Sequence, residues 1–450
     1  MNKMNEKKFA YRPFLLLLTF ATYILAYYYP DVMGERSIIV HLRNFDFNLR
    51  FFIFTLAFIG ITELTASKFN KTRNRESIFW LITLILLSIL WCTRTFESEG
   101  AFSPFLLLFL HCNAAYYVLM RMEMTAEGKT GPMVFFDFIS AFIITPFSNF
   151  LLRIIVFVNA FKNRSFKVNK KKCLPVLTTV IITLILVTFA SSLLSNVDTG
   201  FARLTGGVLN LLPGFDSIFA NYRFYRFITR FIISIPIGAF LMGLIGGSAI
   251  KNEPEFKKEN IVNGLESYRH IPKFAVITVL AALSTIYIIF FIFQIQTIIP
   301  VIGSDSFTAP EASRLAVKGF YELIKILMLN FSVLGVFFFF APESFTEFKD
   351  KRVKFFATLF ATTGICFAVL DYFKLYLYVA NYGFTSRRLV AYWFLLVMFT
   401  AAVLMLIRLY KKFEGIRYIA ILFIVSFILF AFSEGTIIQV TPLVESVLPR

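Results

Sequence analysis

The stretch FAVITVLAALSTIYIIFFIFQIQTII at residues 274–299 contains no Asp, Glu, Lys or Arg. It is long enough to cross the hydrocarbon core of a bilayer, which takes about 20 consecutive apolar residues in a helix. In hydrocarbon every backbone N–H and C=O must be paired, and a single continuous segment can pair them all only as a helix. The stretch therefore predicts a membrane-spanning helix.

Similar apolar runs recur along the whole chain. Hydrophobic residues make up 58% of the sequence and charged residues 16%, whereas soluble domains have about 45–50% and about 25%. The expected fold is an all-α, polytopic transmembrane helix bundle with about 11 spans. The spans are predicted near residues 14–29, 49–66, 78–93, 101–120, 174–194, 227–247, 274–299, 316–341, 355–379, 388–408 and 417–434.

The distribution of Lys and Arg predicts the orientation, because cationic segments beside a span stay in the cytoplasm. With the N-terminus inside, the cytoplasmic segments hold 29 of the 45 Lys and Arg residues, and the external segments hold 12. We therefore expect a multi-pass protein of the cytoplasmic membrane, with a cytoplasmic N-terminus and an external C-terminus. The formal net charge of +18 then reflects this topology and attraction to anionic lipid head groups, not nucleic-acid binding.

Residues 131–161 interrupt this regular pattern. The segment is apolar, but both of its flanks are cytoplasmic by charge, and Pro146 divides it into pieces too short to span comfortably. Asp137 and Arg153 would also be costly in bare lipid. We expect a re-entrant hairpin or two helices at the cytoplasmic interface, with a pair of tilted spans as the alternative. The chain then divides into an N-terminal membrane region, 1–161, and a C-terminal membrane region, 162–450.

The sequence contains no recognisable catalytic or metal-binding motif. Phosphate-loop, zinc-protease and nucleophile-elbow patterns are absent, and the four cysteines are scattered without paired spacing. We therefore expect no catalytic residue, metal or cofactor. His111 lies within the fourth predicted span, where a buried, hydrogen-bonded His that packs between helices is the expected role.

Ionisable residues inside the predicted spans are the strongest functional signal, since such charges must pair or face a wet cavity. Glu322 and Lys325 share one face of the eighth span, and Asp371 and Lys374 share one face of the ninth. The two faces could pair, for example Glu322 with Lys374 and Asp371 with Lys325. They either orient the helices as neutralised ion pairs or line a substrate cavity that opens outward.

A second concentration of charge lies where an external loop enters the sixth span. Arg223, Arg226 and Arg230 fall on one side of a helix, among aromatic residues. Arginine clusters at a membrane surface bind phosphate or carboxylate groups bidentately. The alternative is that they anchor the helix end by snorkelling. Pro236, Gly238 and Gly243 then either soften this span along a transport path or allow close helix packing.

Two short motifs in the C-terminal half resemble those of an uncharacterised bacterial family of multi-pass membrane proteins, known only as a domain of unknown function. Its members carry GFxEL and YGLTxLR-like motifs. The matching residues here are Gly319, Phe320, Glu322, Leu323 and Asn330, then Tyr382, Gly383, Thr385 and Arg388. Phe384, Lys318 and the C-terminal residues 440–450 depart from the pattern. The resemblance implies topology and bacterial origin but no activity. Physically, Gly383 is expected to end one helix and Thr385 to cap the next, with Arg388 at the external interface.

From these observations we expect the protein to be a transporter or permease-like subunit for an anionic or amphipathic, envelope-related substrate. The candidate binding residues are Glu322, Lys325, Asp371, Lys374, Arg223, Arg226, Arg230 and Arg388. Two alternatives stay open: a sensor or regulatory subunit that partners a kinase or an ABC ATPase, and a membrane enzyme that acts on lipid-linked glycans. The expected partners are anionic membrane lipids and a membrane or cytoplasmic protein, without nucleic acid.

Overall fold

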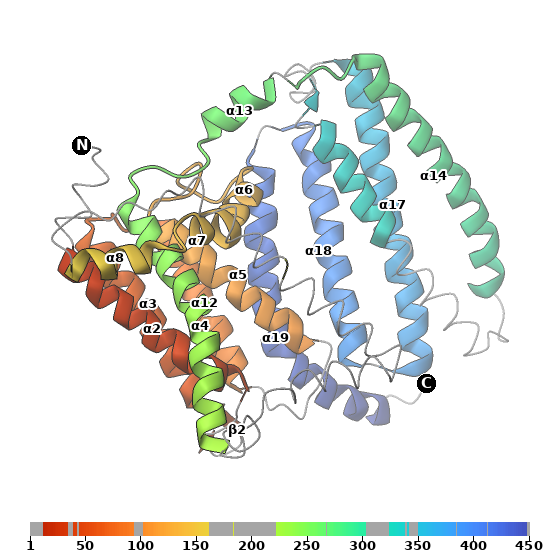
Figure 1. The fold of residues 1–450 in the computed structure, drawn as a ribbon. Coiled ribbons are helices and arrows are strands. Elements are labelled where there is room, and N and C mark those ends of the chain that lie inside the picture. Colours follow the sequence, from red (N-terminus) through yellow and green to blue (C-terminus); the bar gives the residue numbers. More distant parts are fainter. Residues whose placement is uncertain are drawn as a thin grey trace, which may run out of the picture. The chain divides into compact units, whose positions relative to one another are not determined.

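The computed structural model describes most of the chain, and almost all of the described residues are helical (Figure 1). The described residues are 12–34, 39–42, 45–93, 102–161, 183, 222–266, 268–302, 324–337, 340–341, 350–383, 385–411 and 413–447. Within these ranges, nine helical stretches are long and apolar enough to cross a membrane, and Phe105–Arg121 and Ile324–Phe337 are shorter apolar helices. The helical membrane fold is thus confirmed, whereas the count of about 11 spans is not.

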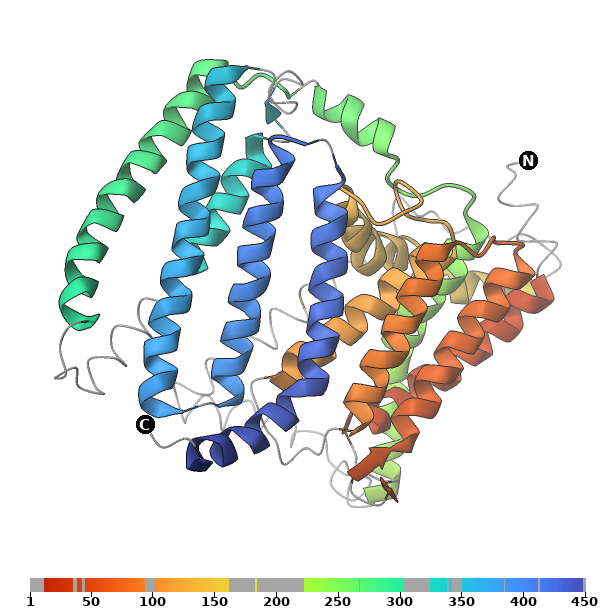
Figure 2. The same cartoon turned by 180° about the vertical axis from the view of Figure 1, so that it is seen from behind.

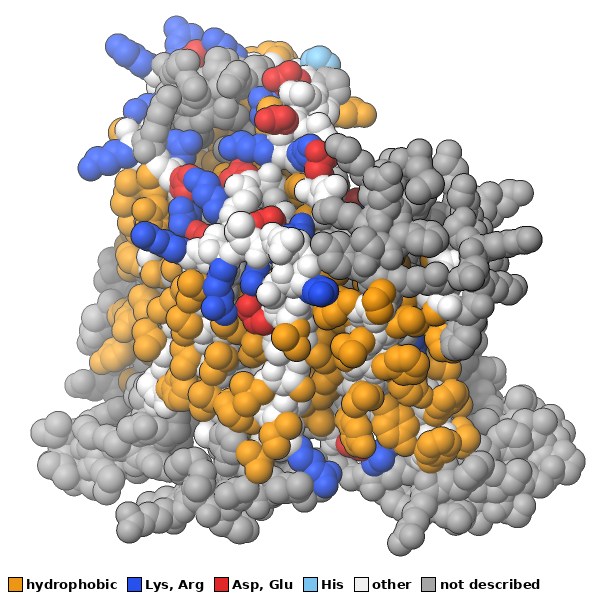
Figure 3. Space-filling view, turned by 90° about the vertical axis from the view of Figure 1, so that its left-hand side faces the viewer, with side chains coloured by type: hydrophobic (Ala, Val, Ile, Leu, Met, Phe, Trp, Pro, Cys, Tyr) orange, Lys and Arg blue, Asp and Glu red, His pale blue; other side chains and the backbone are white. Residues whose placement is uncertain are grey.

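The long helices begin and end close to the predicted runs. They are α2 (Arg12–Gly34), α3 (Leu49–Lys68), α4 (Arg75–Thr93), α5 (Phe102–Arg121), α12 (Tyr222–Ile250), α14 (Lys273–Ile302), α17 (Lys351–Tyr382), α18 (Ser386–Arg408) and α19 (Gly415–Val447). The predicted span 174–194 lies outside the described residues, except for residue 183. On the face shown in Figure 3, hydrophobic side chains cover a broad area and charged side chains gather toward one edge, as expected for a surface in contact with lipid.

A short β-hairpin, which we did not predict, follows α2. Strand β1 (Ile39–Leu42) pairs antiparallel with β2 (Phe45–Asn48), with Ile39 opposite Asn48 and Leu42 opposite Phe45. Asn48 then caps α3, because its side chain accepts a hydrogen bond from the backbone N–H of Phe51 at 3.2 Å.

The described helices form two compact units. The first contains Met1–Arg94, His111–Gly128 and Phe135–Glu255, and the second contains Thr95–Leu110, Lys129–Val134 and Phe256–Arg450. Helix α12, which follows the division predicted at residue 161, groups with the N-terminal helices.

The segment that broke the regular pattern folds as short helical pieces in the first unit. These are α6 (Val134–Ile139), the π-helix η1 (Ser140–Ile144), α7 (Thr145–Ser148) and, after a turn, α8 (Leu152–Phe161). Helix α8 runs crosswise to α2 (Figure 1). Residues 134–160 are among the stretches long and apolar enough to span, although the helix breaks after Ser148. The re-entrant or interfacial placement stays a prediction, and so does the pair of tilted spans.

Glycines on α12 let α7 approach closely. A Cβ on Gly243 would collide with the carbonyl oxygen of Pro146, and one on Gly247 would lie 2.5 Å from Nδ2 of Asn149. A larger residue at either position would push the two helices apart. The glycines of α12 therefore serve helix packing, one of the two roles that the sequence left open.

In the second unit, α14, α17, α18 and α19 stand in a row (Figures 1 and 2). Their core includes Val276, Leu280, Leu327, Phe360 and Phe367, contributed by α14, the helix Ile324–Phe337 and α17. Helices α13 (Lys258–Glu266) and α14 follow one another at the start of this unit.

The turn between α17 and α18 confirms two predictions from the sequence. Gly383 ends α17 with a φ of 72°, a left-handed conformation that favours glycine. The side chain of Thr385 caps α18 by accepting from the backbone N–H of Arg388.

Candidate functional site

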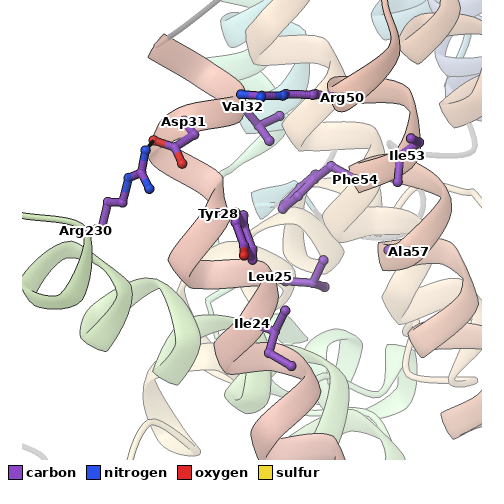
Figure 4. Close-up of a pocket in the computed structure, with 10 residues that line it drawn as sticks. All are labelled: Ile24, Leu25, Tyr28, Asp31, Val32, Arg50, Ile53, Phe54, Ala57 and Arg230. Atoms are coloured by element: carbon purple, nitrogen blue, oxygen red, sulfur yellow. Dashed lines mark ion pairs between the residues drawn. The ribbon is translucent and has the colours of Figure 1, made fainter. Parts of the chain in front are cut away.

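The described part of the chain contains a cavity of about 610 Å³ in the first unit, between α2 and α3 (Figure 4). Its size lies within the range of about 300–1,000 Å³ typical of small-molecule sites. The lining residues are Ile24, Leu25, Tyr28, Asp31 and Val32 from α2, Arg50, Ile53, Phe54 and Ala57 from α3, and Arg230 from α12. We call this the α2–α3 pocket.

Charged groups gather at one end of the α2–α3 pocket. Nη2 of Arg230 lies 2.5 Å from Oδ1 of Asp31, and the two side chains are only 19% and 12% exposed. Arg50 extends from the start of α3 toward the end of α2 (Figure 4). The residues that line this end of the pocket thus bring two guanidinium groups and one carboxylate.

The Arg230 guanidinium is only partly satisfied by this pairing. Its Nε is buried and has no hydrogen-bond partner among the described residues. Its Cζ lies 6.0 Å from the centre of the Tyr27 ring, at the limit of a cation–π contact. Arg230 therefore keeps a donor that an additional anionic group could use.

The rest of the α2–α3 pocket is apolar and opens to the side of the unit. Phe54 points from α3 toward α2 (Figure 4). Ile24, Tyr28 and Ile53 are 57%, 53% and 55% exposed. If the helices span a bilayer, these side chains face the acyl chains, so the pocket can take an apolar tail from the lipid phase.

His111 lies close to the pocket residue Phe54 but serves packing. Its Nε2 is 2.7 Å from the hydroxyl of Tyr29, and the Tyr29 ring contacts Phe54 with 6.0 Å between ring centres. The hydrogen bond between helices agrees with the prediction, whereas His111 is half-buried and not fully buried as expected.

The predicted arginine trio is described only in part. Arg223 and Arg226 belong to the first turns of α12, as expected, but their side chains lie outside the described part of the chain. Arg230 reaches the α2–α3 pocket. A common anion-binding face of the three residues stays a prediction.

The charged residues of the eighth and ninth spans are also described in part. Glu322 lies outside the described residues, and Lys325 is exposed. On α17, Asp371 is completely buried and Lys374 is 5% exposed, so the predicted burial of Asp371 is confirmed. No ion pair between Asp371 and Lys325 is present within the described ranges.

Arg388 is engaged with the end of α17. It donates hydrogen bonds to the carbonyl oxygens of Tyr382 and Gly383, at 2.7 and 2.5 Å, and its Cζ lies 4.4 Å from the centre of the Tyr378 ring. These contacts satisfy carbonyl groups that a helix C-terminus leaves unpaired. A role in substrate binding stays a prediction.

The sequence analysis did not predict a partly buried ionic cluster in the first unit. Glu63 of α3 accepts from Nε of Arg121 at 3.0 Å and from the hydroxyl of Tyr117 at 2.6 Å, and Nη2 of Arg73 lies 3.3 Å away. Nη1 of Arg121 also donates to the carbonyl of Lys71 at 3.0 Å. The available signal was an acidic residue inside the second apolar run, together with a Tyr and an Arg four residues apart at the end of the fourth.

Asp31 and Arg50 were missed as well. They lie where α2 ends and α3 begins, and each looks in the sequence like an ordinary interfacial residue. Only their proximity to Arg230, nearly 200 residues away, makes them a site.

Comparison with known proteins identifies one family. The family described as Domain of unknown function (DUF4153) matches residues 81–438. No curated protein and no solved structure matches the chain.

Proposed function

The chain belongs to the DUF4153 family, a domain of unknown function, and from its own residues we propose that it is a transporter or permease-like subunit of the bacterial cytoplasmic membrane. Its substrate would be an anionic, amphipathic molecule of the cell envelope, held in the α2–α3 pocket. The helices identify an integral membrane protein. The substrate and the transport role are the proposal.

One observation supports this proposal most directly: the α2–α3 pocket joins an end that carries two guanidinium groups to an apolar, laterally open end. Arg50 and Arg230 offer planar donor groups suited to phosphate or carboxylate. The apolar walls and the exposed Ile24 and Ile53 suit a hydrocarbon tail. A purely polar solute would leave these walls without contacts, so the combination favours a lipid-like substrate.

Asp31 adds a selective element to this site. It pairs with Arg230, so an incoming anion has to compete with the Asp31 carboxylate for the same guanidinium group. Such competition makes binding reversible, which transport requires. Neutralising Asp31 is therefore expected to tighten the binding of an anion.

The binding step can be tested by native mass spectrometry of the purified protein with phosphatidylglycerol or phosphatidylcholine. Arg230→Lys is expected to weaken phosphatidylglycerol binding by about tenfold, because Lys cannot reproduce a bidentate contact. Asp31→Asn is expected to strengthen it. Arg352→Lys, at an exposed position at the start of α17, is the matched control and should leave binding unchanged. Equal binding in all variants would refute the site.

Movement of the substrate needs a separate measurement. Proteoliposomes that contain the protein and a fluorescent phosphatidylglycerol should show faster transfer of the probe between leaflets than empty liposomes, and Arg230→Lys should slow this transfer. Binding without transfer would favour the sensor or regulatory subunit instead.

A further inference from the structure

Helix α17 carries one carboxylate in an unusual position. Asp371 is completely buried, on the same helix face as Phe360, Phe367 and Lys374. Residues three, four or seven positions apart lie on one face of a helix, and this face of α17 packs against the rest of the second unit. Along this face of α17, the buried side chains are therefore first aromatic, at Phe360 and Phe367, and then charged, at Asp371 and Lys374.

Neither carboxylate oxygen of Asp371 has a hydrogen-bond partner within the described part of the chain. The hydrophobic contacts continue on both sides of it, with Ala368 in one core cluster and Leu375 and Val379 in the next. An ionised carboxylate without a partner is strongly unfavourable in such surroundings. Asp371 therefore needs a positive ligand.

Lys374 is the charged group that acts electrostatically on Asp371, three residues further along α17. Lys374 is itself buried, with only 5% of its surface exposed. The ammonium group is one possible ligand for the carboxylate, and a proton is the other. A proton is the only cation that needs no further ligands, and the described residues contain no group of three or more His, Cys, Asp or Glu that could hold a metal ion.

The elements that neighbour α17 carry several titratable or charged groups, and four of them are engaged in contacts of their own. On α18, Arg388 binds the end of α17, and the Tyr392 ring lies 5.4 Å from that of Tyr372. On α14, Tyr287 donates to Asn330 at 2.8 Å, and Lys273 pairs with Asp350. The remaining groups on these neighbouring elements are Lys325, Arg387 and Arg408, and those on α17 itself are Lys351, Arg352, Lys354, Cys366, Tyr372, Tyr376, Tyr378 and Tyr382.

We propose that Asp371 is an intramembrane proton-binding site, at which the carboxylate pairs with the Lys374 ammonium in one state and carries a proton in the other. Uptake forms one O–H bond with a proton from water and converts the group from charge −1 to neutral. Release reverses this step. Buried carboxylates in membrane proteins are frequent elements of proton pathways. The site belongs to the second unit and does not depend on the lipid proposed for the α2–α3 pocket.

The test is infrared spectroscopy of the 450-residue protein in phospholipid nanodiscs, titrated with pH. The wild type should show a C=O stretching band of a protonated carboxylic acid that is absent from Asp371→Asn. Asp350→Asn is the matched control, because Asp350 lies at the exposed start of the same helix, and it should keep the band. Lys374→Gln should move the midpoint of the band to higher pH, since the competing positive ligand is removed.

Folding of the variants provides the second criterion. Asp371→Asn is expected to fold with a normal yield, because a neutral amide replaces a group that can itself be neutral. A spectrum of Asp371→Asn identical to that of the wild type would overturn the proposal. A variant that fails to fold, but is rescued by the double change with Lys374→Gln, would also overturn it, because the pair would then be a permanent ion pair.

Discussion

Each unit contains a carboxylate between helices, Glu63 in the first and Asp371 in the second, and the two are held differently. In the first unit, the half-buried Glu63 is held by Arg121, Tyr117 and Arg73. In the second, neither oxygen of Asp371 accepts a hydrogen bond from the described residues. A carboxylate that several donors hold from different helices fixes those helices in place. A carboxylate without such donors can exchange its ligand, and this difference separates architecture from function.

The largest effect is expected from breaking the paired cluster of the first unit. Arg121→Ala leaves Glu63 and Tyr117 without their buried partner and should lower the free energy of unfolding by about 3–5 kcal/mol. Asp371→Asn should change it by less than about 1 kcal/mol. Thermal unfolding of both variants in the same detergent measures the contrast.

Glu253→Gln is the control, because it removes a carboxylate from an exposed loop of the first unit. It shows how much stability is lost when a carboxylate outside the helix contacts is neutralised. If Asp371→Asn proved as damaging as Arg121→Ala, the distinction between the two units would be lost.

An effect of intermediate size is expected from changes in helix packing, which also compare the two units. Gly247→Ala would bring a Cβ within 2.5 Å of Nδ2 and 2.7 Å of Cγ of Asn149, and should destabilise the first unit by about 1–3 kcal/mol. At Gly364 of α17 the nearest atom to a new Cβ is Nδ2 of Asn330, at 3.6 Å. Gly364→Ala should therefore be neutral or stabilising by up to about 1 kcal/mol, through helix propensity.

Denaturation curves of the two alanine variants would decide this prediction. If both variants lost the same free energy of unfolding, the second unit would be packed as tightly around α17 as the first unit is around α12.

The smallest effect concerns a surface cluster of the second unit. Hydrogen bonds from Lys129 and Arg417 lower the pKa of Glu414. A group whose pKa is lower in the folded state stabilises the fold above its ordinary pKa and loses this contribution as the pH falls through the folded pKa. The difference in melting temperature between wild type and Glu414→Gln should thus shrink when the pH falls from about 7 to about 3.

Because these side chains are exposed, salt should weaken the effect of Glu414 even at neutral pH. A difference between wild type and Glu414→Gln that grows in acid would contradict the assigned direction.

Features that depend on neighbouring residues could be predicted from the sequence. The apolar runs predicted the helices because each span satisfies its own backbone. Gly383 and Thr385 predicted the turn between α17 and α18 because helix ends are capped by residues close in sequence. The burial of Asp371 followed from its position inside an apolar run.

Features that depend on distant residues could not be predicted. Arg230 looked like one of three arginines on a helix face, but its partner is Asp31 on α2. Gly243 was compatible with flexibility or packing until the position of α7 was known. Sequence spacing gives the faces of single helices, whereas a site between helices also requires their neighbours and their register.

The contact between α7 and α12 can form only late in the synthesis of the chain. Pro146 and Asn149 are synthesised nearly 100 residues before Gly243 and Gly247. At about 5–20 residues per second, the ribosome needs on the order of ten seconds to produce the helix that will cover them. During this interval Thr145 and Asn149, which are buried in the finished protein, have no α12 to cover them. Nascent chains halted before residue 222 should therefore be the form of this protein that chaperones and membrane proteases recognise most readily.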